Sequence, residues 1–207
     1  MDYRETTVSK IKRVRISRIN ESHVFDPKRI DVLESEDRKT WQNTDEILDL
    51  IELKSSYIVA DLGCGNGYFA VPISRKVKKV YGIDVQKEML EFLEQKIRSQ
   101  NIGNIELLLS KDNKIPLEDQ SLDLLINVNT LHEFRDKNKI AKEMQRVIKS
   151  DGRVVIIDFK KEDSGFGPPL AIRVSEDQAK QLFEERGFAC VKSSELLYHY
   201  LMVFHRT

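Results

Sequence analysis

Cysteine is scarce in this 207-residue sequence, which contains only Cys64 and Cys190, and the two show no metal-type spacing. A disulfide scaffold is therefore not expected, no metal site is predicted, and a reduced, intracellular setting is favoured. The sequence also lacks a signal peptide and any apolar run of membrane-spanning length. These absences predict a soluble, cytoplasmic protein without a membrane partner.

Net charge is absent as well, because 34 lysines and arginines balance 34 aspartates and glutamates. No global field therefore attracts nucleic acid or an anionic membrane, and such a partner would need a local patch. One candidate patch is residues 10–19, which interleave five cations with aliphatic side chains and contain no acid. This run could contact RNA, an acidic protein or an anionic surface, or it could form an edge strand or a partly ordered arm.

The apolar pattern indicates one α/β domain, since 40% of the residues are hydrophobic and can form a continuous core. Short apolar runs predict buried strands, and apolar residues at helical spacing predict helices between them. The predicted strands cover residues 57–62, 79–84, 105–109, 122–128 and 153–159. The predicted helices cover about 43–51, 89–97, 137–149 and 175–187. Strands that alternate with helices favour a parallel sheet with helices on both faces.

The C-terminal part departs from this alternation. Two apolar runs, 188–191 and 196–204, follow one another with no helical pattern between them. They predict a closing antiparallel hairpin at a sheet edge. The predicted fold class is therefore α/β, a doubly wound, mostly parallel seven-stranded sheet with a C-terminal antiparallel hairpin strand.

Three glycines, Gly63, Gly65 and Gly67, follow the first predicted strand, and the first of them stands two residues after Asp61. In doubly wound sheets small molecules bind at such a strand-to-helix turn, where main-chain amides can approach them closely. A dinucleotide fingerprint would need glycine at position 68, which is Tyr68 here, and a phosphate-binding P-loop would need Gly-Lys-Ser/Thr. What remains is an acid before alternating glycines, with a second acid, Asp84, at the end of the next strand.

Residues 61–67 (DLGCGNG) resemble the first motif of class I S-adenosylmethionine-dependent methyltransferases, and residues 82–84 (GID) with Met89 and Leu90 resemble the second. Further matches in register are residues 115–123, 131–134 and 148–153. The resemblance is to small single-domain members with a methyltransferase-11 or ubiquinone-biosynthesis-like core. It implies the Rossmann-like methyltransferase fold over roughly residues 43–207 and S-adenosylmethionine as the cofactor.

The first 42 residues precede this core. Residues 25–29 with Leu33 resemble a pattern found ahead of the core in some family members, where N-terminal segments can cover the cofactor. Residues 1–42 are therefore predicted to be a basic segment and a possible cofactor lid, and residues 43–207 the methyltransferase domain.

The resemblance implies roles for the residues around the glycines. An acid at position 61 can accept from the ammonium group of the cofactor, while loop amides approach its carboxylate and ribose. Asp84 can accept both ribose hydroxyls, Val85 could pack on the adenine, and Asp112 could accept from the adenine amino group, where Lys111 is a departure from the family. The predicted cofactor-binding residues are Asp61, Gly63, Cys64, Gly65, Gly67, Asp84, Val85, Asp112 and Asn127.

Methyl transfer is an in-line displacement in which positioning can supply much of the acceleration, so a dedicated base is optional. His132 beside Glu133 could act as a base, with Asn129 contacting the acceptor, although these residues could equally cap a helix or pack. Other residues that could contact the acceptor follow the fourth and fifth predicted strands: Asn127, Thr130, Asp158 and Lys160. Residues 164–169, rich in glycine and proline, could cover the acceptor or form a plain surface loop.

Several acceptors are argued against by what the motifs lack. Residues 127–130 (NVNT) differ from the N/D/S-P-P-aromatic run of enzymes that methylate exocyclic amines of nucleic-acid bases, so DNA base methylation is not expected. No cysteine follows a proline, as in carbon-5 cytosine enzymes, and the cysteine set of arsenite enzymes is missing. The expected acceptor is a small molecule; the alternatives are a protein side chain, or a binding module that holds the cofactor without transfer.

Overall fold

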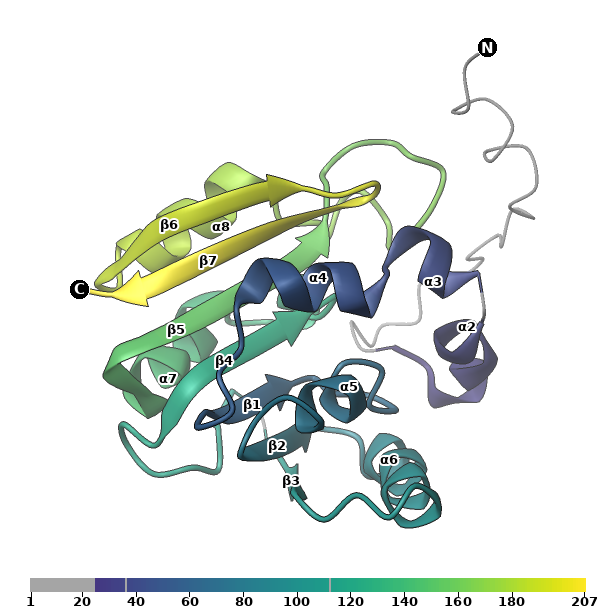
Figure 1. Cartoon of the computed structure of the whole chain (residues 1–207). Helices are drawn as coiled ribbons and strands as arrows, with labels where there is room; N and C mark the ends of the chain where they lie inside the picture. Colours follow the sequence, from purple (N-terminus) through teal and green to yellow (C-terminus); the bar gives the residue numbers. More distant parts are fainter. Residues whose placement is uncertain (1–24, 36, 112) are drawn as a thin grey trace.

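The computed structural model describes residues 25–35, 37–111 and 113–207. The basic run 10–19 and Asp112 lie outside the described residues. The centre of the structure is a seven-stranded sheet in the order β3-β2-β1-β4-β5-β7-β6 (Figure 1). Its strands are β1 (Ile58–Leu62), β2 (Lys79–Asp84), β3 (Ile105–Leu109), β4 (Leu122–Val128), β5 (Ile148–Phe159), β6 (Phe188–Glu195) and β7 (His199–Arg206).

Strand pairing confirms the predicted doubly wound arrangement. β1 pairs in parallel with β2 on one side and with β4 on the other, so the strand order reverses at β1. β7 pairs antiparallel with both β5 and β6 and closes the sheet. The carboxyl ends of β1 and β4 therefore lie at the point where ligands bind in this class of fold.

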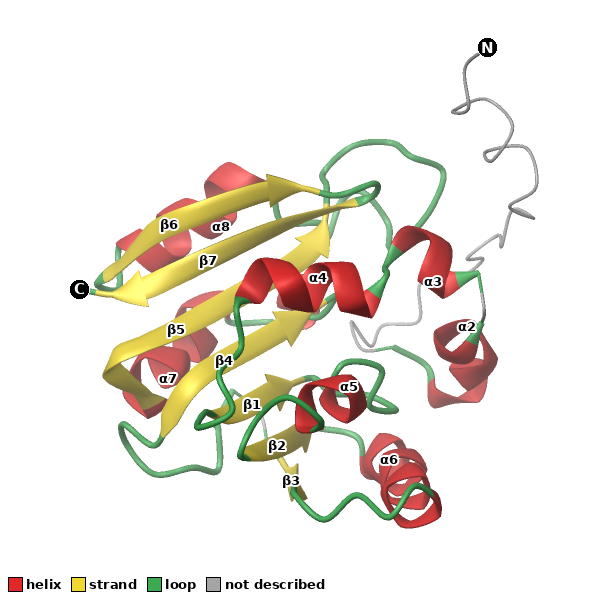
Figure 2. Ribbon diagram, in the orientation of Figure 1, coloured by secondary structure: helices red, strands yellow, loops and turns green. Residues whose placement is uncertain are grey.

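Helices cover both faces of the sheet, with α4, α5 and α6 on one face and α7 and α8 on the other (Figure 2). The short helices η1, α2 and α3 lie instead beyond the carboxyl ends of the strands (Figure 1). The helices are η1 (Pro27–Arg29), α2 (Ile30–Glu34), α3 (Arg38–Trp41), α4 (Thr44–Ile51), α5 (Ala70–Ser74), α6 (Lys87–Ser99), η2 (Leu131–Glu133), α7 (Lys137–Val147) and α8 (Glu176–Glu184). Among the described residues, none of these is long and apolar enough to cross a membrane.

Alternate residues of the central strands fill two hydrophobic cores. Val59 and Leu124 pack with the α4 and α5 side chains, whereas Ala60 and Leu125 pack with α7 and α8. All four side chains are fully buried. A parallel strand covered on both faces has no polar face, which explains the continuous apolar runs in the sequence.

Polar side chains cap the first turns of α4 and α8. Asn43 accepts from the amides of Asp45 and Glu46 at the start of α4. Ser175 and Gln178 form a reciprocal capping box at the start of α8. These side chains satisfy amides that would otherwise lack partners in the first turn of each helix.

Three strands differ from the predictions by more than one residue. β5 begins at Ile148 instead of residue 153, β6 extends to Glu195 instead of residue 191, and β7 spans His199–Arg206 instead of residues 196–204. The additional part of β6 alternates between exposed and half-buried side chains because it lies at the sheet edge. An expectation based on apolar runs therefore ends this strand too early and assigns the turn residues 196–198 to the next strand.

We predict that Gly67→Ala destabilises the fold. Gly67 has φ +82°, and a Cβ atom there would lie 2.3 Å from Cδ1 of the buried Leu93. The free energy of unfolding, measured by urea titration, should fall by about 1–3 kcal/mol, the cost of a strained backbone. Gly103→Ala is the matched control, because nothing lies within 4 Å of a Cβ built there. Equal stabilities of the two variants would contradict the prediction.

Candidate active site

The glycine loop, residues 63–67, is held against the end of β2. The amides of Gly63 and Cys64 both donate to the carbonyl of Ile83, at 2.7 and 3.0 Å. A Cβ at position 63 would lie 2.6 Å from Cγ2 of Thr130, so only glycine permits this close approach. Cys64 is buried in the core below the loop, and the pKa of its thiol is raised by burial. A ligand at the loop can therefore contact the main chain of Cys64 but not its side chain.

Asp84 ends β2 with its carboxylate in a defined orientation. Its Oδ2 atom accepts from the amide of Gly65 and its Oδ1 atom from the amide of Gln86, both at 2.9 Å. A carboxylate has about four acceptor positions, so further hydrogen bonds from a diol remain possible. The next side chain, Val85, is 43% exposed although it is apolar. This pair can hold a ribose and the face of an attached base.

Asp61 is the second acid of the loop, and it is only 2% exposed. Burial and, to a smaller extent, the nearby charge of Asp84 together raise the pKa of Asp61 to about 7, although the Ala70 amide and the charge of Arg38 oppose the shift. Burial also raises the pKa of Asp84. Two buried carboxylates near each other favour a bound cation. The ammonium and sulfonium groups of S-adenosylmethionine are such cations, so the residues fit this cofactor.

Asn127, at the end of β4, is completely buried below the glycine loop. Its side-chain amide donates to the carbonyl of Leu62 at 2.8 Å and to the hydroxyl of Thr130. Its Oδ1 atom has no hydrogen-bond partner among the described residues. Asn127 therefore positions the chain after β4 and leaves one acceptor at the cofactor loop.

Asn129 lies where the chain turns away from β4, in a left-handed conformation with φ +57°. Both atoms of its side-chain amide contact Gln42, at 3.2 and 3.3 Å. Gln42 directly follows α3 and is itself buried. The structure thus places Asn129 in a link between the β4 loop and α3.

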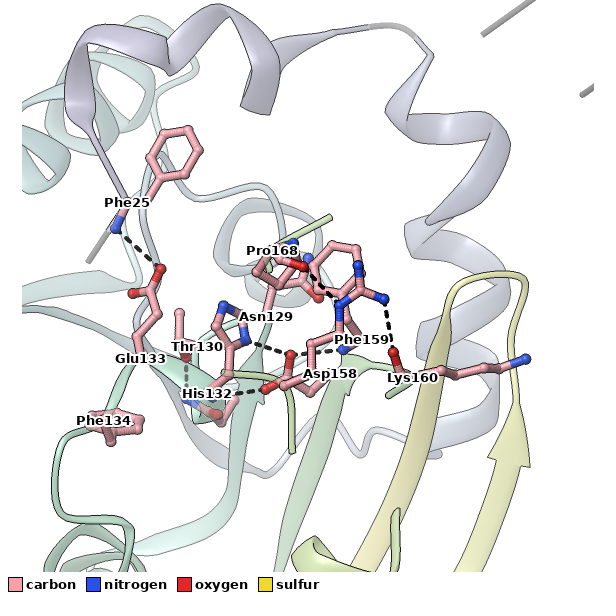
Figure 3. Close-up of polar contacts among 12 residues, drawn as sticks. Phe25, Asn129, Thr130, His132, Glu133, Phe134, Asp158, Phe159, Lys160 and Pro168 are labelled. Atoms are coloured by element: carbon pink, nitrogen blue, oxygen red, sulfur yellow. Dashed lines mark hydrogen bonds and ion pairs between the residues drawn. The ribbon is translucent and has the colours of Figure 1, made fainter. Parts of the chain in front are cut away.

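His132 and Asp158 form a buried pair at the ends of β4 and β5 (Figure 3). The His132 amide donates to Oδ2 at 3.0 Å, and Nδ1 lies 2.7 Å from Oδ1. Burial lowers the pKa of His132, but the charge and hydrogen bond of Asp158 outweigh this and raise it above its usual value. Assigning the Nδ1 proton to this bond leaves Nε2 as the free ring nitrogen, without a hydrogen bond to any described residue.

Glu133 points away from His132, toward the N-terminal segment (Figure 3). Its carboxylate accepts from the amide of Phe25 at 3.1 Å, and burial raises the pKa of Glu133 to about 8. The carbonyl of Phe25 accepts from the side chain of Gln86 at 2.8 Å. The main chain at Phe25 therefore links the ends of β2 and β4. The partner of His132 is Asp158, and the adjacent Glu133 has a different role.

The conformation of residues 164–169 is held by Arg173, which donates hydrogen bonds to main-chain carbonyls in and before this loop. The Arg173 guanidinium donates to the carbonyls of Pro168 and Lys160, at 2.8 and 2.9 Å, and to that of Glu162 at 2.7 Å. The ammonium of Lys160 forms an ion pair with Glu195 on the edge strand. Lys160 therefore points away from His132 and Asp158.

Aromatic rings gather beside this loop. The Phe166 ring lies 4.8 Å from those of both Trp41 and Tyr198. His199 is completely buried, 4.2 Å from the Phe159 ring, and burial lowers its pKa to about 3. Trp41 also stacks on His199, with the ring centres 5.6 Å apart. The side of the site beyond β5 is therefore apolar and lined by rings.

Sequence reasoning did not single out Arg38, Trp41, Gln42, Arg173 or His199. The first three lie before the motifs of the core. Trp41, the only tryptophan of the sequence, could have indicated that this segment contributes to the site. His199 stands in an apolar run that indicated only a strand, and Arg173 lies between the interpreted segments, after the 164–169 run and before the helix predicted from residue 175.

Comparison with known proteins agrees with this geometry. A family model described as a methyltransferase domain matches residues 53–202. A crystal structure of an S-adenosylmethionine-dependent methyltransferase from Aquifex aeolicus is 32% identical and superposes with a TM-score of 0.82. The match covers 87% of this chain and 98% of that one. This chain belongs to the S-adenosylmethionine-dependent methyltransferases.

Curated relatives of this methyltransferase are more distant. It is 30% identical over 107 residues to the uncharacterised methyltransferase YcgJ of Bacillus subtilis, which covers 52% of this chain and 42% of that protein. It is 31% identical over 112 residues to a demethylmenaquinone methyltransferase of Lactobacillus johnsonii, which covers 52% and 46% of the two chains. The chain therefore spans less than half the length of these two relatives in each match.

We predict that Asp61→Asn stabilises the cofactor-free methyltransferase at high pH. The raised pKa of Asp61, about 7, means that the folded state disfavours the ionised form. The contribution of wild-type Asp61 to stability is therefore present at low pH and lost as the pH rises through about 7. In urea titrations the variant should be more stable than wild type at pH 8, with a smaller gain at pH 5.

The same variant should bind S-adenosylhomocysteine more weakly, because it lacks the charge that attracts the ammonium group. Asp151→Asn, at an exposed position, is the control for a simple loss of negative charge. A stability gain that is the same at both pH values would contradict the assigned shift.

Proposed function

We propose that this methyltransferase methylates a small molecule whose nucleophilic atom carries a proton, with His132 as the base that removes it. The observation that supports this proposal is the buried His132–Asp158 pair, which follows Thr130, the residue packed against Gly63 of the cofactor loop. When bound, S-adenosylmethionine supplies a methyl group activated by the sulfonium charge. The protein then has to orient the acceptor, exclude water and accept one proton.

The two contacts with Asp158 suit His132 to that task. They fix both the main chain and the ring, so Nε2 keeps one direction. A base within hydrogen-bond reach and with a pKa near the working pH transfers protons efficiently. Asp158 also stabilises the imidazolium that forms when Nε2 takes up the acceptor proton. His132 is therefore the proposed catalytic base and Asp158 the residue that positions it.

The surroundings of this pair favour a small, apolar acceptor. The Phe159 ring lies 6.2 Å from the His132 ring, and the Trp41, Phe166 and Tyr198 rings continue the apolar surface. Such rings bury flat, apolar ligands well. A demethylmenaquinone methyltransferase among the relatives, whose name specifies a small-molecule acceptor, also supports this class. Glu133 and Asn129 are proposed to position the N-terminal segment and α3 respectively.

Asp158→Asn is predicted to lower the pKa of His132. Asp158 supplies the largest contribution that raises this pKa, so its neutral amide should let burial dominate. The titration of the His132 ring, followed by NMR, should move to lower pH. The acid limb of activity should move in the same direction while the maximal rate falls, because the ring loses its orientation. Asp177→Asn, exposed on α8, should leave both unchanged, and an unshifted His132 titration in Asp158→Asn would contradict the assignment.

The acceptor class is tested with a radiolabelled methyl donor and a cell extract separated into small molecules, protein and RNA. Label should enter the small-molecule fraction, and His132→Gln should reduce it by about 10²-fold or more, the usual size of a lost acid–base contribution. Label in the protein fraction would indicate a side-chain acceptor. No label in any fraction, with cofactor binding intact, would indicate a binding module. Either result would contradict the proposal.

A further inference from the structure

Arg38 is a buried cation at the glycine loop, and its described hydrogen-bond partners are neutral. The side chain belongs to α3, and the residue is only 6% exposed. Its Nε and one terminal nitrogen donate to Oε1 of Gln42, at 3.0 and 2.9 Å, and the other terminal nitrogen to the carbonyl of Leu33 at 3.3 Å. A buried charge ordinarily has a charged partner, so Arg38 has the features of a residue that binds an anion.

The position of Arg38 associates it with the cofactor loop. Its guanidinium lies over the ring of Tyr68, 3.8 Å from the ring centre, and Tyr68 directly follows the last glycine of the loop. The charges of Arg38 and Asp61 influence each other, yet no ion pair or hydrogen bond joins these two described residues. The loop is therefore accompanied by one buried cation and one buried acid that do not neutralise each other by contact.

We propose that Arg38 binds the carboxylate of the methionine portion of S-adenosylmethionine, while Asp61 binds its ammonium group. An amino acid end carries both charges, and separate partners of opposite sign recognise it better than main-chain amides alone. Arginine suits a carboxylate because its planar donors match the two oxygens. Arg38 then joins the loop amides as a cofactor-binding residue. Its role is independent of the acceptor.

Gln42 and Asn129 are positioning residues in the same arrangement. The Gln42 side chain receives two bonds from Arg38 and contacts Asn129, which fixes the guanidinium relative to the end of β4. The Tyr68 hydroxyl donates to the carbonyl of Gln42 at 2.8 Å. The α3 segment is thus connected to both the glycine loop and the β4 loop through the residues that hold Arg38.

Calorimetry with two ligands tests this role without any turnover. The ligands are S-adenosylhomocysteine and its carboxamide, in which an uncharged amide replaces the carboxylate and the ammonium group is retained. The wild-type protein should prefer the carboxylate ligand by about tenfold or more, as expected for a charge-assisted contact. In Arg38→Met the preference should fall to about twofold or less. Arg98→Met, which removes an exposed arginine paired with Glu94 on α6, should keep the wild-type preference.

A purely structural role for Arg38 would give different results. Equal weakening of both ligands in Arg38→Met would mean that the residue only holds α3 in place, and this would overturn the proposal. A wild-type protein that does not distinguish the two ligands would overturn it too. If Arg38→Met does not fold, Arg38→Lys is used instead, because lysine keeps the positive charge but lacks the planar pair of donors of the guanidinium. A several-fold smaller preference in Arg38→Lys supports the role, and an unchanged preference contradicts it.

Discussion

Two carboxylates, Asp61 and Asp84, are buried close enough to influence each other where β1 and β2 end, and we propose that they form the cofactor half of the site. Charges in such a place are costly unless they are paired or hydrogen-bonded. The Gly65 and Gln86 amides bind Asp84, whereas Asp61 keeps a raised pKa. We propose that the cationic cofactor compensates for this cost, so that the same charges that destabilise the cofactor-free protein provide binding energy.

The acceptor half of the site depends on different strands. His132 and Asp158 come from the ends of β4 and β5, so changes in the acceptor need not disturb the acids at β1 and β2. The N-terminal segment connects the two halves, because Phe25 contacts Gln86 beyond β2 and Glu133 beyond β4. We propose that this segment covers the cofactor, a role for which these contacts are the support.

Local patterns predicted most of the fold and the cofactor. Apolar runs predicted the strands and helices, and the glycines with Asp61 and Asp84 indicated the cofactor, because each of these signals depends on neighbours in sequence. The partner of His132 was not predictable in the same way, since Asp158 lies 26 residues away and approaches it only through β4–β5 pairing. Arg38 was missed for the same reason, as its burial arises from α3 packing on a distant loop.

We propose that the acids of β1 and β2 hold S-adenosylmethionine at the glycine loop. A crystal structure of the complex with S-adenosylhomocysteine would show whether they do. We expect the ribose hydroxyls on the carboxylate of Asp84, with the homocysteine end beside Asp61. A nucleoside bound elsewhere, with Asp84 contacting only main-chain amides as it does now, would contradict it.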